Sequence, residues 1–336
     1  MTKNLQIQLA RQRDGMPEDA DFRLVEAELP RPGPGQILVR TVYLSLDPYV
    51  RKAIRGDHPG HDVLVEGDVI YGRSVCRVVS SDVAGYQPGD YVVAETGWQQ
   101  HAVIGPEKIV QDVDPASGPL SSAIGALGMP GLTAWGSVEH ISKPSLGETL
   151  VVSAAAGPVG ACVGQLAKLR GARVVGIAGG PEKCGLVTKT YGFDACINYK
   201  EKGWQDQLKT ACPDGVNVYH DNVGGPLLSA MASHLALYAR VVMCGRPAEY
   251  HSSSHQSVGL GPFIGCRVKV CGMVVYDYEH DFARYLRLAS EWMRGGRLKV
   301  KEDRVEGLEN TPAHFLKLMR GENIGKAIVA VGPERA

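Results

Sequence analysis

The amino-acid sequence predicts an α/β protein in which a β-rich region precedes a doubly wound parallel sheet. Residues 1–125 alternate between apolar and polar positions and are rich in turn residues, as half-buried strands are. Residues 149–177 read as a buried strand, a tight glycine turn, a helix and a second buried strand. After residue 183 short apolar strands and helical segments keep alternating, which is typical of a parallel sheet.

The first region is expected to form a twisted sheet or small barrel, with strands at 36–44, 69–80 and 91–94. Its alternation stops at residues 44–51, LSLDPYVR. There Tyr49 carries a phenol that can donate a hydrogen bond, and Arg51 carries a fixed positive charge. A half-buried packing aromatic explains Tyr49 equally well from the residues alone.

Residues 149–160 indicate a nucleotide site. The strand 149–153 leads into Ala155-x-Gly157-x-x-Gly160, the spacing of the dinucleotide fingerprint with alanine in the first glycine position. Small residues in this turn let the backbone approach a pyrophosphate at the start of the following helix. Gly164 is expected to let that helix approach the neighbouring strand. The alternative is a glycine turn without a ligand.

The end of the second strand, 173–177, bears on the choice of cofactor. An NAD site usually offers a carboxylate there, but this chain offers Ala-Gly-Gly-Pro at 178–181. The small residues leave room for a phosphate, and Lys183 can supply positive charge, which favours NADP(H). Against this, Lys183 could be an ordinary solvated lysine, and Glu182 has the wrong charge for a phosphate neighbour.

The rest of the chain continues the βα rhythm. Strands are expected at 195–199, 216–223, 239–245 and 268–276, and helices at 204–211 and 280–294. The second helix should bury one face, made of Phe282, Tyr285, Leu286, Ala289 and Met293. A helix starting within 123–136 would place Met129 and Thr133 on one face. The tail from residue 297 alternates like a strand and is expected to rejoin the first domain.

Composition excludes several classes of protein. Lys plus Arg and Asp plus Glu both number 36, so the formal net charge is zero, and nothing points to nucleic acid or a membrane surface. The N-terminus lacks the apolar core of a signal peptide, and no run is long enough to span a bilayer. The eight cysteines contain no C-x-x-C pair and read as free thiols, so a reducing, cytoplasmic location is expected.

The chain also lacks several catalytic motifs. There is no G-x-S-x-G elbow, no phosphate-binding G-x-x-x-x-G-K-[ST] loop and no tyrosine followed four positions later by lysine. A catalytic zinc needs three protein ligands, and no cluster has ligand spacing. His58, His61 and His101 are therefore interpreted as loop or structural residues, and no metal is expected.

Over nearly its full length the chain resembles the zinc-independent medium-chain reductases. The similarity is to the prostaglandin reductase and alkenal/one reductase group, and in particular to bacterial NADPH-dependent curcumin reductases. The motifs that carry it are YLSLDPYVR at 43–51, GMPGLTAWG at 128–136, DNVGG at 221–225, CGRPAEY at 244–250, CGMVVYDY at 271–278 and GENIGKAIV at 321–329, together with the fingerprint at 149–184.

The resemblance implies a GroES-like catalytic domain at 1–125 with a C-terminal return at 298–336, and a Rossmann NADP-binding domain at 126–297. It implies reduction of the C=C bond of α,β-unsaturated ketones and aldehydes, and often a homodimer. Tyr49 would bind the substrate carbonyl, whereas Lys183 and Tyr199 would hold the 2′-phosphate of NADP(H). The cofactor-binding residues implied are Met129, Thr133, Gly157, Pro158, Val159, Gly160, Lys183, Tyr199, Asn222, Cys244, Gly245, Arg246, Tyr250, Met273, Val274, Val275, Tyr276 and Asn323.

Two departures from the family bear on the substrate. Arg73 stands near the expected pocket where relatives often have Gly, Tyr or Gln, and would favour an anionic group. A tyrosine that some relatives carry is missing, and Phe263 and Gly265 stand in that area. Two other functions remain open, namely quinone reduction and NADPH binding without turnover.

Overall fold

The computed structural model describes residues 3–56, 62–250 and 257–335. The chain divides into two compact units. The β-rich unit comprises Met1–Ile124 and Glu302–Ala336, and the parallel-sheet unit comprises Gly125–Lys301. The last strands of the chain therefore belong to the same unit as the first ones.

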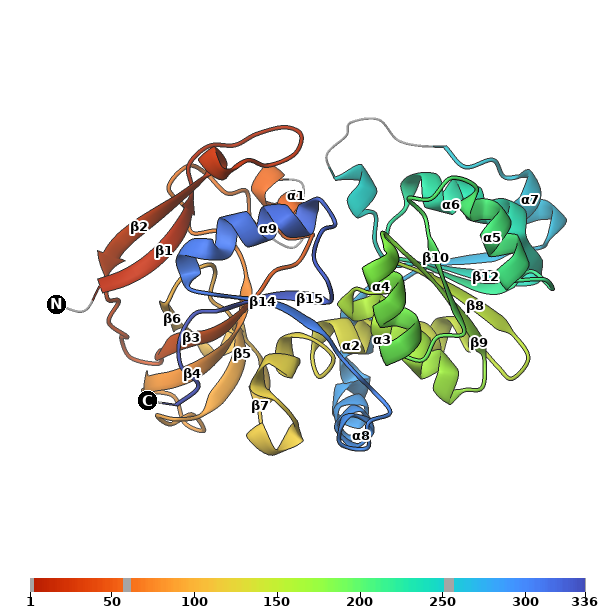
Figure 1. Cartoon of the computed structure of the whole chain (residues 1–336). Helices are drawn as coiled ribbons and strands as arrows, with labels where there is room; N and C mark the ends of the chain where they lie inside the picture. Colours follow the sequence, from red (N-terminus) through yellow and green to blue (C-terminus); the bar gives the residue numbers. More distant parts are fainter. Residues whose placement is uncertain (1–2, 57–61, 251–256, 336) are drawn as a thin grey trace. The chain divides into compact units, whose positions relative to one another are not determined.

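The β-rich unit contains a seven-stranded sheet in the order β14-β15-β3-β4-β5-β7, with β6 also paired to β3 (Figure 1). A separate antiparallel pair, β1 and β2, completes its strands. Their bounds are β1 (Lys3–Leu9), β2 (Phe22–Glu28), β3 (Ile37–Ser45), β4 (Arg73–Ser81), β5 (Tyr91–Glu95), β6 (His101–Ile104), β7 (Ile109–Val113), β14 (Glu302–Glu306) and β15 (Lys326–Ala330).

An aromatic cluster joins distant parts of this unit. Trp98 stacks on Phe22 of β2 with ring centroids 5.6 Å apart, and it packs in a T-shaped arrangement with Phe315 of helix α9 (Thr311–Met319), with ring centroids 5.3 Å apart. Trp98 and Phe315 are fully buried. The cluster packs the β1–β2 pair and the C-terminal helix against one core. Each aromatic side chain in it buries a large apolar area.

Helix α9 corrects the expectation that the whole tail is strand-like. That expectation is right for β14 and β15 but wrong for residues 311–319 between them. Thr311, His314 and Phe315 are buried at helical spacing, and Pro312 lies in the first turn, where proline is tolerated. The short helix α1 (Val50–Arg55) follows Tyr49, where the sequence indicates only the end of alternation.

The parallel-sheet unit has the strand order β10-β9-β8-β11-β12-β13, which is the doubly wound Rossmann order, and every pairing is parallel. The predicted α/β fold class is thus confirmed. The strands are β8 (Thr149–Ser153), β9 (Arg173–Ala178), β10 (Ala195–Asn198), β11 (Val216–Asp221), β12 (Leu235–Met243) and β13 (Lys269–Gly272).

Helices cover both faces of this sheet. One core packs Leu150 and Val152 of β8 against α2 (Met129–Trp135), α3 (Pro158–Leu169) and α8 (Phe282–Arg294). The other packs Val151 against α5 (Trp204–Ala211), α6 (Gly225–Met231) and, at its margin, α7 (Gly261–Gly265). Successive residues of one strand thus face opposite layers, as the strand pleat requires. The predicted buried face of α8 is confirmed.

Two local expectations need correction. Strand β13 ends at Gly272, so residues 273–276 lie beyond it, and a 3₁₀ helix begins at Val275. The backbone N–H of Met273 still donates to the carbonyl of Met243, 2.9 Å away, which directs the chain out of the sheet. The sequence predicts that Gly164 lets α3 approach a neighbouring strand, but this glycine lies against the ring of Phe193 instead. A Cβ added at Gly164 would lie 1.9 Å from this ring.

Candidate functional site

The carboxyl ends of β8 and β11 form the switch point of the parallel sheet, because the chain winds in opposite directions from these two neighbouring strands. Ser153 ends β8, and its hydroxyl donates to the carboxylate of Asp221 at 2.9 Å. The side-chain amide of Asn222 donates to the Ser153 carbonyl at 2.9 Å, and its backbone N–H donates to the Ser153 hydroxyl at 2.8 Å. These bonds fix both strand ends where open α/β sheets bind ligands.

Asp221 accepts several of the hydrogen bonds that fix the carboxyl ends of β8 and β11. It is fully buried, and its Oδ1 atom accepts hydrogen bonds from the Tyr219 hydroxyl and from the backbone N–H groups of Val223 and Gly224, at 3.0–3.1 Å. A carboxylate can accept several donors at once, which suits it to hold a turn. Sequence reasoning quoted this residue within DNVGG but did not select it. Its position at the end of a predicted strand was the available signal.

The turn before α3 fits a pyrophosphate. The backbone N–H groups in the first turn of any helix lack an intrahelical partner. Gly157, which precedes α3, has no side chain that could accept from them. A Cβ on Gly160 would lie 2.5 Å from the Ala154 carbonyl oxygen, so the turn requires glycine there. The amides, the helix dipole and the place at the switch point together suit an anion.

The β9–α4 turn and the end of β10 lie together. A Cβ on Gly179 would lie 3.0 Å from the Tyr199 hydroxyl and 3.1 Å from Cε of Lys200, so both side chains run beside this glycine. Asn198 accepts the Gly180 N–H at 2.8 Å and ties the turn to β10. Lys200 thus adds a positive charge beside the turn that leads into α4 (Pro181–Gly185), the helix that carries Lys183. Sequence reasoning missed it, although it directly follows Tyr199.

The loop after β12 is held against the same edge. The N–H groups of Cys244 and Gly245 donate to the Asp221 carbonyl at 2.8 and 3.2 Å. Arg246 forms an ion pair with Glu249 at 3.1 Å, and Tyr250 is the last described residue of the loop. The structure therefore brings Asn222, Cys244 and Gly245 together, as a shared cofactor site would need.

The structure brings together only some of the other predicted cofactor residues, namely Met129 and Thr133, predicted to flank the nicotinamide, and residues 273–276, predicted to line the rest of the cofactor. The Thr133 hydroxyl donates to the Met129 carbonyl at 2.8 Å, one turn earlier in α2. Met273 is buried, and its terminal methyl lies 3.0 Å from where a Cβ on Gly136 would stand, so it packs beside the end of α2. Val275 packs on the core beneath, whereas Val274 and Tyr276 are more than half exposed.

In the β-rich unit, a buried ion pair holds the turn before Tyr49. The Lys326 ammonium donates to the Asp47 carboxylate at 2.8 Å and to the Leu46 carbonyl at 2.7 Å, and the Ser45 hydroxyl also donates to Asp47. Lys326 is 4% exposed and Asp47 8% exposed. Tyr49 is half-buried, packs against the core of this unit and leads into α1.

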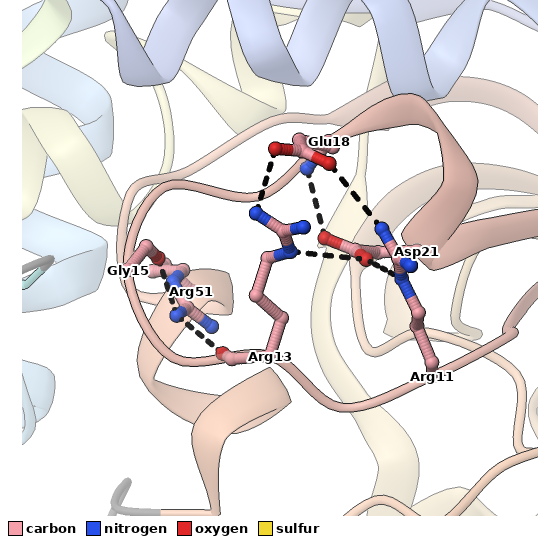
Figure 2. A network of polar contacts seen from close by, with 6 residues as sticks. All are labelled: Arg11, Arg13, Gly15, Glu18, Asp21 and Arg51. Carbon is pink, nitrogen blue, oxygen red and sulfur yellow. Dashed lines mark hydrogen bonds and ion pairs between the residues drawn. The ribbon is translucent and has the colours of Figure 1, made fainter.

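Arg51 ties α1 to the loop after β1 (Figure 2). Its guanidinium is fully buried and donates to the carbonyls of Arg13 and Gly15, at 2.7 and 2.6 Å. The same loop is closed by Arg11 and Arg13, which bind the carboxylates of Asp21 and Glu18. The fixed charge of Arg51 therefore supports the backbone next to Tyr49.

Two further predicted residues also lie in the β-rich unit. Arg73 is 9% exposed, and its guanidinium binds the Glu95 carboxylate at 3.0 and 3.2 Å. An anionic substrate would have to compete with Glu95, so the preference for such substrates stays a prediction. The Asn323 side chain donates to the Gly325 carbonyl at 2.8 Å, in the turn before β15.

Within residues 3–56, 62–250 and 257–335, no group of three His, Cys, Asp or Glu side chains is placed to hold a metal ion. His101 is half-exposed, and burial lowers the pKa of its ring, with the Arg40 charge adding to the effect. His58 and His61 lie outside the described residues. In the same described part of the chain, no helix combines the length and the apolar character that crossing a bilayer demands.

The doubly wound sheet and the glycine turn at its switch point define a dinucleotide-binding protein, built of two units. Residues 5–112 match the family model described as the N-terminal domain of oxidoreductase, and residues 158–291 match the model described as zinc-binding dehydrogenase. The chain belongs to the medium-chain dehydrogenase/reductase family.

Individual relatives are similar over the whole chain. The NADPH-dependent curcumin reductase of Escherichia coli is 39% identical over 331 residues, which cover 96% of this chain and 95% of the relative. The NADP⁺-dependent 2-alkenal reductase of Nicotiana tabacum is 36% identical and covers 98% of each chain. The crystal structure of CurA from Vibrio vulnificus in complex with NADPH is 36% identical with a TM-score of 0.92, covering 98% of this chain and 99% of CurA.

Proposed function

We propose that the protein reduces the C=C bond of α,β-unsaturated ketones and aldehydes with NADPH. The observation that carries the proposal is the nucleotide edge of the parallel sheet. It combines the uncapped start of α3 with a β9 end that lacks an acid and has Tyr199 and Lys200 beside Gly179. The substrate class rests on the relatives, whose names include curcumin, 2-alkenal and pulegone reductases.

The parallel-sheet unit would hold the cofactor. The amides at Val159 and Gly160 suit the pyrophosphate, and Lys183, Tyr199 and Lys200 suit the 2′-phosphate. Met129 and Thr133 would flank the nicotinamide. The rest of the cofactor would be lined by Asn222, Cys244, Gly245, Arg246, Tyr250, Met273, Val274, Val275 and Tyr276, and by Asn323 of the β-rich unit. When bound, NADPH supplies the hydride that adds to the β-carbon of the substrate.

Tyr49 would act on the substrate carbonyl. As the β-carbon gains the hydride, negative charge develops on the carbonyl oxygen, and a hydroxyl donor aimed at that oxygen lowers the barrier. The turn that presents Tyr49 is fixed on both sides, by Lys326 and Asp47 before it and by Arg51 after it. The α-carbon then takes a proton from solvent or a nearby hydroxyl, which completes a saturated carbonyl product.

A substrate screen tests the proposal. NADPH oxidation would be followed with alkenals, enones, curcuminoids and simple quinones, and the products would be analysed. The proposal predicts a saturated carbonyl product from enones and a clear preference for NADPH over NADH. Oxidation with quinones alone would instead identify a quinone reductase. Tight NADPH binding without oxidation across the panel would identify a binding protein without turnover.

We also propose that the protein is a cytoplasmic homodimer. Strand β13 lies at the edge of the parallel sheet, and its four residues are exposed, with Val270 53% exposed. Nearby Leu260 and Ile264 are 69% and 76% exposed. An edge with unpaired backbone groups and apolar side chains is suited to pair with a second copy. Light scattering should give the mass of two chains, and a single-chain mass at micromolar concentration would contradict this.

A further inference from the structure

Two cysteines meet beside the predicted 2′-phosphate site. The Sγ atoms of Cys184 on α4 and Cys196 on β10 are 2.9 Å apart, and both side chains are half-buried free thiols. A disulfide bond requires a sulfur separation of about 2.05 Å and side chains that point at each other. The two sulfurs therefore need to approach by only about 0.9 Å, from elements that are already packed together.

The elements that carry these thiols also carry the predicted phosphate-binding residues. Cys184 directly follows Lys183 on α4, and β10 continues from Cys196 to Asn198 and then to Tyr199. Asn198 also binds the Gly180 N–H at 2.8 Å, which joins β10 to the turn before α4. A covalent bond between the two sulfurs would therefore act directly on the two elements from which Lys183 and Tyr199 extend.

We propose that Cys184 and Cys196 form an oxidisable dithiol whose disulfide weakens NADPH binding, an effect that rests on the cofactor site of the proposed function. With hydrogen peroxide as oxidant, the Cys184 sulfur attacks one peroxide oxygen, forms a sulfenic acid and releases water. The Cys196 sulfur then attacks the sulfur of this sulfenic acid, forms the S–S bond and displaces the sulfenic oxygen as water, so two thiols and one peroxide give one disulfide and two waters. A thiol reductant restores the pair.

The environment of the two thiols affects the rate of their oxidation, because it shifts their pKa values. Burial raises the pKa of the Cys184 thiol; the hydrogen bond from Cys196 opposes this rise, and the nearby Glu201 carboxylate adds to it. Burial and the contact with Cys184 raise the pKa of Cys196 much further. Because the thiolate is the attacking form, the less shifted Cys184 should react first, and the reaction should be slow at neutral pH. The experiment therefore needs excess peroxide and a time course.

The test uses the whole protein, reduced or treated with hydrogen peroxide, and read by peptide mapping and by NADPH titration. The expected results are a cross-linked peptide pair containing Cys184 and Cys196, and an NADPH Kd raised roughly fivefold or more, reversed by dithiothreitol. In Cys184→Ser and Cys196→Ser, peroxide should leave the Kd unchanged. Cys271→Ser, which removes an exposed cysteine on β13, should behave like the wild type.

Three results would count against the proposal. No Cys184–Cys196 peptide after full peroxide exposure would overturn the dithiol itself. A mapped disulfide with an unchanged NADPH Kd would overturn its effect on the cofactor. Reduced protein that binds no NADPH would overturn the proposed function and the coupling with it, whereas the mapping would still report the disulfide.

Discussion

In the proposed reaction, Tyr49 is the side chain that would donate a hydrogen bond to the substrate carbonyl. A buried ion pair and hydrogen bonds hold the turn that carries Tyr49. They fix the position of the backbone from which the phenol extends. Fixed donors are effective because they need no reorganisation when charge develops on the substrate. The role of Tyr49 itself remains a prediction.

We predict that Tyr49→Phe lowers kcat for enones by on the order of 10², the typical loss when one donor to a developing oxyanion is removed. The Kd for NADPH should stay within about twofold, because Tyr49 is predicted to contact the substrate and not the cofactor. Steady-state kinetics and NADPH titration provide the measurement. Tyr91→Phe is the matched control, because its hydroxyl binds the Glu334 carbonyl and its loss should leave kcat unchanged. Unaltered enone kinetics in Tyr49→Phe would remove Tyr49 from the mechanism.

Lys183 is the predicted charge partner of the 2′-phosphate. Lys183→Ala should raise the NADPH Kd about tenfold or more, since a hydrogen bond to a charged group contributes roughly 1.5–3 kcal/mol. The NADH Kd should stay the same, because NADH lacks this phosphate. Lys189→Ala, an exposed lysine further along the same segment, is the control. Equal losses for NADPH and NADH would show that Lys183 acts on the structure rather than on the phosphate.

His220 makes stability depend on pH. Burial lowers the pKa of its ring to about 3, and its Nε2 atom is 2.9 Å from the Ser137 hydroxyl. The unfolded ring has a pKa of about 6.5, so the unfolded chain binds a proton that the folded chain excludes. This contribution to stability is complete above about pH 6.5 and is lost as pH falls toward 3.

Urea unfolding at a series of pH values checks this expectation. His220→Gln should show a shallower fall in the free energy of unfolding between about pH 6.5 and 4 than the wild type. His280→Gln, which changes an exposed ring, should keep the wild-type slope. An unchanged slope in His220→Gln would assign the acid sensitivity to other groups.

At the scale of elements, the ion pair between Lys326 and Asp47 joins β15 to the turn that precedes α1. These residues lie 279 positions apart in the chain. Lys326→Met should lower the free energy of unfolding by roughly 3–5 kcal/mol, because it leaves the Asp47 carboxylate buried without its cation. Lys3→Met, which breaks the exposed pair with Glu26, should cost no more than about 1 kcal/mol. Similar losses in the two variants, measured by urea unfolding, would contradict this assignment.

The same pair explains where sequence reasoning succeeds and where it fails. Strand β8 and helix α5 have the predicted bounds, because buried parallel strands and amphipathic helices are defined by local patterns. Nothing local pairs Lys326 with Asp47, because the contact arises only when the tail returns to the first sheet. Sequence reasoning misses helix α9, because the tail as a whole reads as strand-like alternation, although the spacing of its buried residues suits a helix.

At the scale of the whole molecule, the fold class and the family can be predicted from the sequence. The glycine turn and the alternating strands and helices that indicate them lie in one continuous stretch of the chain. The candidate site depends on longer-range contacts. Asp221 and Lys200 were not selected, because their importance comes from the ends of neighbouring strands meeting at one edge. The predicted site residues are divided between two units, with Tyr49, Arg73 and Asn323 in the β-rich unit and the others in the parallel-sheet unit.

The most direct test of the central claim follows the transferred hydrogen. NADPH carrying deuterium at the reactive C4 position would be incubated with an enone, and the product examined by NMR. We predict a saturated ketone with deuterium on the β-carbon and solvent hydrogen on the α-carbon. Deuterium on the carbonyl carbon of an unsaturated alcohol, or no deuterium in any product, would contradict it.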